Sequence, residues 1–246
     1  MHRSVKILFI LLFIGAKANA QESNIKQFQG KEALFYLIIL LILIFAFLKR
    51  AFPKYFNDLF RVFFRSTLKQ RQIKEQLIQT PFPSILLNGF FVVSGGLYIA
   101  FLVQYFRLDP LGNFWLMFIY GSILLSLIYL VKFCTLKASG WVFSMEEQAD
   151  SYIFIVFIIN KMLGIFLIPF LVLLAFAQGG LYKAGITLSC VAVGAMYIYR
   201  GILTYSAIRN QVKVNPFHFF LWLLAFEIAP LLLIYKGLLL FFRISA

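Results

Sequence analysis

Three ionisable side chains inside long apolar stretches are the residues of this 246-residue chain whose types could do chemistry. They are Lys161 in "FIINKMLGIF", Arg200 in "AMYIYRGILT" and Glu227 in "LLAFEIAPLL". A charge at the middle of a bilayer costs roughly 2.5–3.5 kcal/mol on insertion scales, so such residues usually face the interior of a helical bundle and pair. These residue types therefore predict an interhelical cluster of two cations and one carboxylate.

The depths of the three residues allow them to meet. Counted from the cytoplasmic ends of their predicted spans, Lys161, Arg200 and Glu227 lie roughly 15, 10 and 16 Å deep at 1.5 Å per residue. Lys161 and Glu227 would be nearly level, and Arg200 would be shallower by about one helical turn. We therefore expect Glu227 to be held by Lys161, by Arg200 or by both.

A polar residue and two prolines accompany this cluster. Asn160 precedes Lys161, and Pro169 and Pro230 each lack the N–H that would bond a carbonyl one turn earlier. Helix-kinking prolines of this kind often line transporter sites, although they are also common in membrane helices. Three interpretations stay open: a structural cluster that sets helix register, a functional polar site, or a shallow Lys161 whose ammonium snorkels to the interface.

Catalytic and metal-binding patterns are missing from the sequence. It contains no HExxH, no GxSxG and no CxxC. The stretch "EEQADS" begins like a motif of intramembrane proteases, but Ser151 stands where that motif needs Arg. His218 is the only histidine of the predicted mature chain, which excludes a bis-histidine haem within it. We therefore predict a protein that is not an enzyme and that carries no metal or cofactor.

The elements that position these residues are predicted from composition. Hydrophobic residues make up 62% of the chain and charged residues 13%, against about a quarter charged in soluble domains. Several apolar runs approach the roughly 20 residues that cross a bilayer as a helix. The fold class is therefore all-α, a polytopic bundle of membrane helices. The net charge of +14 then reflects Lys and Arg in cytoplasmic loops, and we predict no nucleic-acid partner.

The first 20 residues have the pattern of a signal peptide. Arg3 and Lys6 precede an apolar run over 7–16, and Ala18-Asn19-Ala20 forms a cleavage site. We predict cleavage after Ala20, with retention as an anchor as the alternative. Residues 21–32 would then be a short external segment, which implies a bacterial inner-membrane protein whose mature N-terminus lies outside the cytoplasm.

Residues 33–246 are predicted to form one integral membrane domain. Its six spans cover about 33–48, 84–105, 113–131, 151–177, 184–207 and 216–235. The cytoplasmic loops would be 49–83, 132–150 and 208–215, and they hold twelve Lys and Arg against six in the external segments. This asymmetry follows the positive-inside rule and supports the predicted orientation.

A basic, aromatic stretch over 54–78 follows the first span. Lys54, Arg61, Arg65 and Lys69 recur at helical intervals, and phenylalanines and leucines occupy the positions between them. The pattern is typical of a helix in the membrane plane whose basic side faces anionic phospholipid headgroups. Alternatively, these four residues would face a protein partner.

Three segments resemble a known family. "FNDLFRVFFRSTL", "FIINKMLGIFLIPFLVLLAF" and "FFLWLLAFEIAPLLLIYK" are similar to the uncharacterised Bacteroidota membrane proteins known as domain of unknown function 4271. The residues that match the family pattern are Asn160, Lys161, Gly164, Pro169, Glu227 and Pro230. The resemblance implies a Gram-negative inner-membrane protein and supplies no activity.

The function that we expect is that of a non-catalytic envelope accessory or assembly protein. The loops are too short for soluble domains, so its partners would be lipids, other membrane proteins or a second copy of the chain. The alternative is a small transporter or channel that uses the cluster of Lys161, Arg200 and Glu227. That alternative predicts a water-accessible cavity at Glu227.

Overall fold

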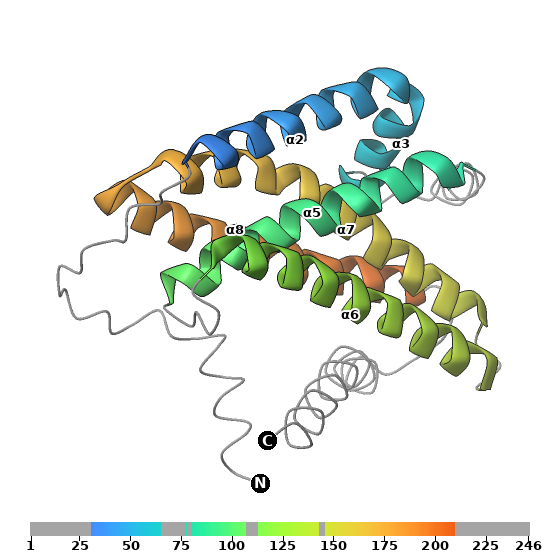
Figure 1. The fold of residues 1–246 in the computed structure, drawn as a ribbon. Coiled ribbons are helices and arrows are strands. Elements are labelled where there is room, and N and C mark those ends of the chain that lie inside the picture. Colours follow the sequence, from blue (N-terminus) through green and yellow to red (C-terminus); the bar gives the residue numbers. More distant parts are fainter. Residues whose placement is uncertain (1–30, 65–76, 78–79, 107–112, 143–145, 210–246) are drawn as a thin grey trace, which may run out of the picture. The chain divides into compact units, whose positions relative to one another are not determined.

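The computed structural model describes residues 31–64, 77, 80–106, 113–142 and 146–209. The architecture below is that of the helices in these ranges. Its helices are α2 (Lys31–Ala51), α3 (Pro53–Phe64), α5 (Pro81–Tyr105), α6 (Phe114–Val142), α7 (Glu146–Phe176) and α8 (Gly179–Arg209) (Figure 1). Every regular element within these ranges is a helix, which confirms the all-α fold class.

Five of these helices are long and apolar enough to cross a membrane, namely α2, α5, α6, α7 and α8. They correspond to five of the six predicted spans, and the sixth, 216–235, lies outside the described residues. The helices continue beyond the predicted limits: α6 reaches Val142 and α7 begins at Glu146. Much of the segment 132–150, which we expected to be a loop, is therefore helical. The charged residues of this segment predicted a loop, but the segment holds no proline that would end the helix.

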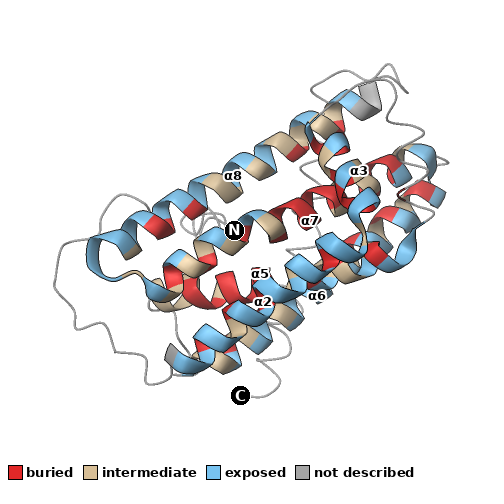
Figure 2. Ribbon diagram, turned by 90° about the horizontal axis from the view of Figure 1, so that it is seen from above, coloured by how far each residue is buried: buried red, intermediate tan, exposed pale blue. Residues whose placement is uncertain are grey.

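Helices α5 and α7 form the centre of the bundle. Within an 18-residue apolar stretch of each helix, 56% of the residues are buried in α5 and in α7, compared with 22% in α2 and 17% in α6 and in α8. Figure 2 shows a nearly continuous run of buried residues on part of α7, while exposed residues predominate on α2 and α8. Helices α5 and α7 run in one direction and α2, α6 and α8 in the other (Figure 1).

Glycines let the central helices approach closely. A Cβ atom at Gly164 of α7 would lie 2.9 Å from the Cα atom of Phe91 on α5. A Cβ atom at Gly96 of α5 would likewise lie 2.9 Å from the Cα atom of Ser122 on α6. Because a side chain would collide with backbone at both points, the packing of α5 against its two neighbours depends on these glycines.

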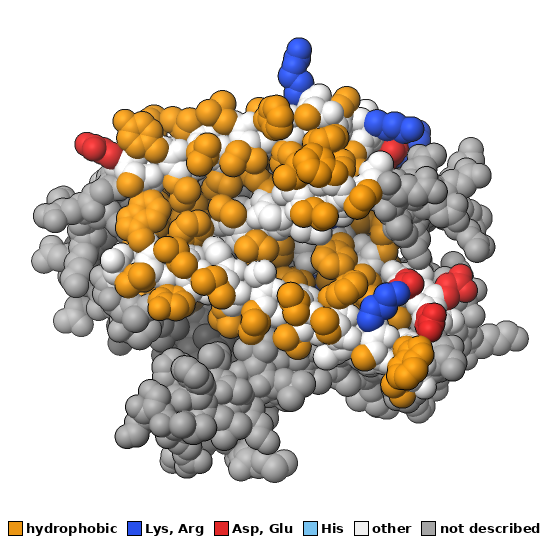
Figure 3. All heavy atoms as spheres, turned by 45° about the vertical axis from the view of Figure 1, so that its right-hand side comes forward, with side chains coloured by type: hydrophobic (Ala, Val, Ile, Leu, Met, Phe, Trp, Pro, Cys, Tyr) orange, Lys and Arg blue, Asp and Glu red, His pale blue; other side chains and the backbone are white. Residues whose placement is uncertain are grey.

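The outer helices present apolar side chains to the surroundings. Phe47 of α2, Leu130 of α6 and Ile198 of α8 are among the large hydrophobic residues that stay exposed. Figure 3 shows hydrophobic side chains over most of one face, with the charged side chains at its margins. Such a surface is suited to lipid and not to water. The chain is therefore a membrane protein.

Candidate functional site

Helix α3 packs its aromatic face on the bundle. Tyr55, Phe56, Leu59, Val62 and Phe63 are its buried residues, and Pro53 occupies the first turn, where a missing N–H is harmless. The ring of Phe56 meets that of Phe45 on α2, with centroids 5.8 Å apart, and the ring of Phe63 lies 6.1 Å from that of Phe166 on α7.

The opposite face of α3 is basic, as its spacing predicts. Lys54 and Arg61 are exposed on it. Arg65 and Lys69, the other two residues expected to face headgroups or a partner, lie outside the described residues. The predicted helix over 54–78 is thus seen over Pro53–Phe64.

Lys161 is buried near the middle of α7 and joins it to two other helices. Its side chain is 4% exposed. Its ammonium nitrogen donates hydrogen bonds to the hydroxyl oxygens of Tyr55 on α3, at 2.8 Å, and of Ser84 in the first turns of α5, at 2.7 Å. The same nitrogen lies 5.5 Å from the centroid of the Tyr55 ring. We call these three residues the hydroxyl–lysine cluster.

The acceptors in this cluster are neutral. Burial raises the pKa of the Tyr55 hydroxyl above its ordinary value of 10.0, and a hydrogen bond with Ser84 acts in the opposite direction. Within the described ranges, both partners of the Lys161 ammonium are hydroxyls, and no carboxylate lies in ion-pair range of it. Lys161 lies fifteen residues after the start of α7 at Glu146, and its side chain is buried. Its partner Ser84 lies in the first turn of α5, so the ammonium is level with the beginning of that span, and the interpretation of a shallow Lys161 stays open.

The other members of the predicted site are only partly described. Asn160 is buried beside Lys161, with 3% of its surface exposed. Pro169 lies inside α7, and the helix continues past it to Phe176. Glu227 and Pro230 lie outside the described residues, so the pairing of Glu227 stays a prediction.

Arg200 occupies a different setting from Lys161. It is 3% exposed on α8, and its guanidinium carbon lies 4.5 Å from the centroid of the Tyr197 ring. The Tyr197 hydroxyl oxygen is 3.3 Å from that of Tyr129 on α6. The structure therefore brings Lys161 to α3 and α5, and Arg200 to the side of α8 that reaches α6.

Lys132 is a buried cation that sequence reasoning missed. We placed it in a cytoplasmic loop, but it is 6% exposed on α6, with its ammonium nitrogen 5.4 Å from the centroid of the Tyr152 ring. The available indication was spacing: Tyr129, Lys132, Phe133 and Leu136 recur at helical intervals and so share one face.

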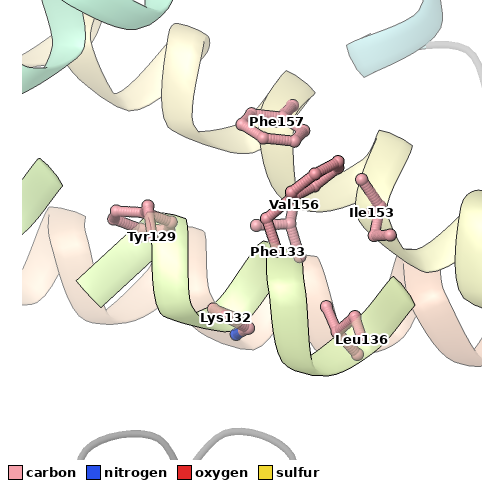
Figure 4. A pocket seen from close by; sticks show the side chains of 7 residues that line it. All are labelled: Tyr129, Lys132, Phe133, Leu136, Ile153, Val156 and Phe157. Atoms are coloured by element: carbon pink, nitrogen blue, oxygen red, sulfur yellow. The ribbon is translucent and has the colours of Figure 1, made fainter. Parts of the chain in front are cut away.

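Lys132 also lines a small pocket between α6 and α7. Its walls are the side chains of Tyr129, Lys132, Phe133, Leu136, Ile153, Val156 and Phe157 (Figure 4). The pocket has room for no more than about one water molecule. It is therefore a packing defect beside a buried cation and too small for an organic substrate.

The described residues offer no metal centre. No group of three or more His, Cys, Asp or Glu side chains that could hold an ion occurs in this part of the chain. Cys134 and Cys190 are free and exposed. In the described ranges, the groups that could take part in binding or chemistry are therefore the buried cations and the hydroxyls around them.

Comparison with known proteins identifies a family and nothing more specific. No curated protein and no solved structure matches the chain. The family model described as "Domain of unknown function (DUF4271)" matches residues 34–238, which is most of the chain and includes every predicted site residue. The match confirms the resemblance seen in the sequence, and the chain belongs to the DUF4271 family, whose function is unknown.

Proposed function

We propose that this membrane protein is a non-catalytic accessory or assembly protein of the envelope. The observation that carries the proposal is the hydroxyl–lysine cluster. The buried ammonium of Lys161 donates hydrogen bonds to Tyr55 on α3 and to Ser84 on α5, so it links α7 to two other helices. In this proposal the cation acts as a structural element.

The basic face of α3 supports an interaction role. Lys54 and Arg61 are exposed on it, and Lys49 and Arg50 are exposed at the adjoining end of α2. Each Lys or Arg near an anionic leaflet contributes roughly 1 kcal/mol of attraction. We propose anionic phospholipid headgroups as the partners of this face, and other membrane proteins or a second copy of the chain as partners of the exposed apolar helices.

The proposed location is the bacterial inner membrane of a Bacteroidota cell. The support is the signal-peptide pattern over 1–20, the excess of Lys and Arg in one set of loops, and the family. In this orientation the mature N-terminus lies outside the cytoplasm and α3 lies on the cytoplasmic side.

A small transporter or channel is the second candidate. Two observations favour it: Lys161 and Arg200 are buried charges, which in membrane helices often mark ion or proton paths, and Pro169 frees a carbonyl inside α7. This candidate would use Lys161, Arg200, Glu227 and Asn160 as a polar site. It requires water to reach Glu227.

Thiol accessibility separates the two candidates. In a Cys134→Ser/Cys190→Ser background, Glu227→Cys is treated in sealed membranes, from either side, with a charged maleimide that does not cross the bilayer. The accessory role predicts no labelling at position 227, whereas Asn57→Cys on the exposed face of α3 labels readily as the control. Rapid labelling at position 227 in folded protein would contradict the accessory role and favour a transport path.

A further inference from the structure

Helices α2 and α6 each carry a row of exposed apolar side chains along one side. The α2 seam consists of Tyr36, Leu40, Leu43 and Phe47, and the α6 seam consists of Leu116, Tyr120, Ile123, Leu127 and Leu130. Each of these residues is between 40% and 69% exposed. They recur at alternating intervals of four and three residues, which is the spacing along the contact between two supercoiled helices. Both helices therefore offer a surface on which another helix can pack.

The two seams belong to helices that run in the same direction on different sides of the bundle. Figure 1 shows α2 and α6 on opposite sides of α5, with their ends pointing the same way. One copy of the chain cannot bring its own α2 and α6 seams together. Two copies that lie side by side in one membrane share one orientation, so α2 of the first can meet α6 of the second as a parallel pair.

The ends of these two helices carry opposite charge. Helix α2 finishes with Lys49 and Arg50, which are both exposed. The turn after α6 leads into Glu146 and Glu147, which are exposed in the first turn of α7. None of these four side chains forms an ion pair with a described residue. Nearby, Lys137 on α6 and Asp150 on α7 neutralise one another, with the nitrogen and oxygen 2.7 Å apart.

This charge pattern distinguishes the possible pairings of the seams. Packing α2 on α2 would bring the cations of two copies together, and packing α6 on α6 would bring their glutamates together. Packing α2 on α6 places Lys49 and Arg50 of one copy at the same side of the membrane as Glu146 and Glu147 of the other. Opposite charges favour an encounter and like charges disfavour it, so the mixed pairing is selected.

We propose that the protein associates with further copies of itself through the α2 seam of one copy and the α6 seam of the next. Because the two surfaces differ, the contact is heterologous and builds a row or a closed ring of copies, not a two-fold dimer. The inference rests on the proposed accessory role and names the partner of its exposed apolar helices. The basic face of α3 stays available to lipid headgroups.

Disulfide cross-linking between copies tests the proposal. In a Cys134→Ser/Cys190→Ser background, Phe47→Cys and Leu130→Cys stand at equal distances from the starts of α2 and α6, so we expect them at similar depths. When the two variants are expressed together, mild oxidation of the membranes should form linked dimers several-fold faster than with either variant alone. A chain that carries both cysteines should form a ladder of three and more copies.

Leu188→Cys on α8 is the matched control, because this leucine is also exposed on an apolar outer helix. Its cross-linking to Phe47→Cys should be slow. Equally fast linking of Phe47→Cys to itself or to Leu188→Cys would overturn the proposal. So would the absence of linked copies, which would mean that lipid alone covers both seams. Such a failure leaves the accessory role intact, because labelling at position 227 tests that role without any contact between copies.

A charge exchange tests the selecting charges. Glu147→Arg in the Leu130→Cys copy should slow its cross-linking to Phe47→Cys several-fold, and Arg50→Glu in the Phe47→Cys copy should restore the rate. Lys183→Glu, at the start of α8, should change nothing. The restored rate cannot come from a misfolded chain, so it separates charge selection from a loss of structure. An unchanged rate in the Glu147→Arg copy, or no recovery with Arg50→Glu, would contradict the pairing by charge.

Discussion

At the scale of the residue, the protein keeps a lysine buried among hydroxyls. Hydrogen bonds to a charged group contribute roughly 1.5–3 kcal/mol, and an acceptor removed from a buried charge leaves that charge partly unsatisfied. Tyr55 and Ser84 each supply one such acceptor to Lys161. The cluster is therefore expected to behave as one unit, in which the loss of a hydroxyl matters only while the charge is present.

A double-mutant cycle tests this unit. Tyr55→Phe is expected to lower the free energy of unfolding by about 1.5–3 kcal/mol, because the ammonium loses an acceptor. In a Lys161→Met background the same change should cost much less, with a coupling energy of about 1–3 kcal/mol. Thermal unfolding in one detergent measures both values. Tyr120→Phe, at an exposed tyrosine of α6, is the control that should change nothing, and strictly additive losses would show that the two groups do not interact.

At the scale of the element, two features position the cluster: the close packing of α5 against α7 and the docking of α3. Gly164 lets α7 meet the backbone of α5 at Phe91. Tyr199 of α8 donates a hydrogen bond to the carbonyl of Phe63 near the end of α3, and its ring lies 5.1 Å from that of Phe63. Helix α3 is thus held by Lys161 near its start and by Tyr199 near its end.

The α5–α7 contact predicts a large effect from one methyl group. Gly164→Ala places a Cβ atom 2.9 Å from the Cα atom of Phe91, so the two helices must move apart. We expect a loss of about 1–3 kcal/mol in the free energy of unfolding. Gly89→Ala on α5 meets nothing within 4 Å and should be neutral or slightly stabilising. Equal melting temperatures for the two variants would contradict the close contact.

The docking of α3 predicts a local effect without global unfolding. Tyr199→Phe removes the hydroxyl that bonds the Phe63 carbonyl, so the end of α3 should open more often. Hydrogen–deuterium exchange of peptides covering 53–64 is expected to quicken, while peptides from the centre of α7 keep their protection. Tyr36→Phe, at an exposed tyrosine of α2, is the matched control. Unchanged exchange in α3 would mean that the hydroxyl does not hold it.

At the scale of the whole molecule, the bundle is apolar outside and carries cations where α2 meets α3. Lys54 and Arg61 of α3 should bind anionic headgroups, so phosphatidylglycerol should raise the melting temperature more than phosphatidylcholine does. Lys54→Gln/Arg61→Gln is expected to reduce that difference by at least half. Lys183→Gln, at the far end of the bundle on α8, should leave it intact (Figure 1). An undiminished difference in the double variant would exclude α3 as the lipid-binding face.

The sequence predicts this architecture well and its polar contacts poorly. Apolar runs of span length locate α2 and α5–α8, and the 3.6-residue period identifies α3. The partners of Lys161 were not predictable, because Tyr55 and Ser84 stand 106 and 77 residues away and neutral hydroxyls have no distinctive pattern. The sequence predicts a loop at Lys132 because of its charge, whereas its aromatic neighbours bury it within α6.

The most direct test of the account replaces the hydroxyl–lysine cluster with apolar residues of similar size. A strain carries Lys161→Met, Tyr55→Phe and Ser84→Ala together in place of the native protein, and its phenotype is compared with the deletion strain at equal membrane abundance. Because Lys161 is proposed to have a purely structural role, the triple variant is expected to fold and to complement the deletion. A folded, equally abundant variant that fails to complement would contradict the account and assign the cluster a chemical role.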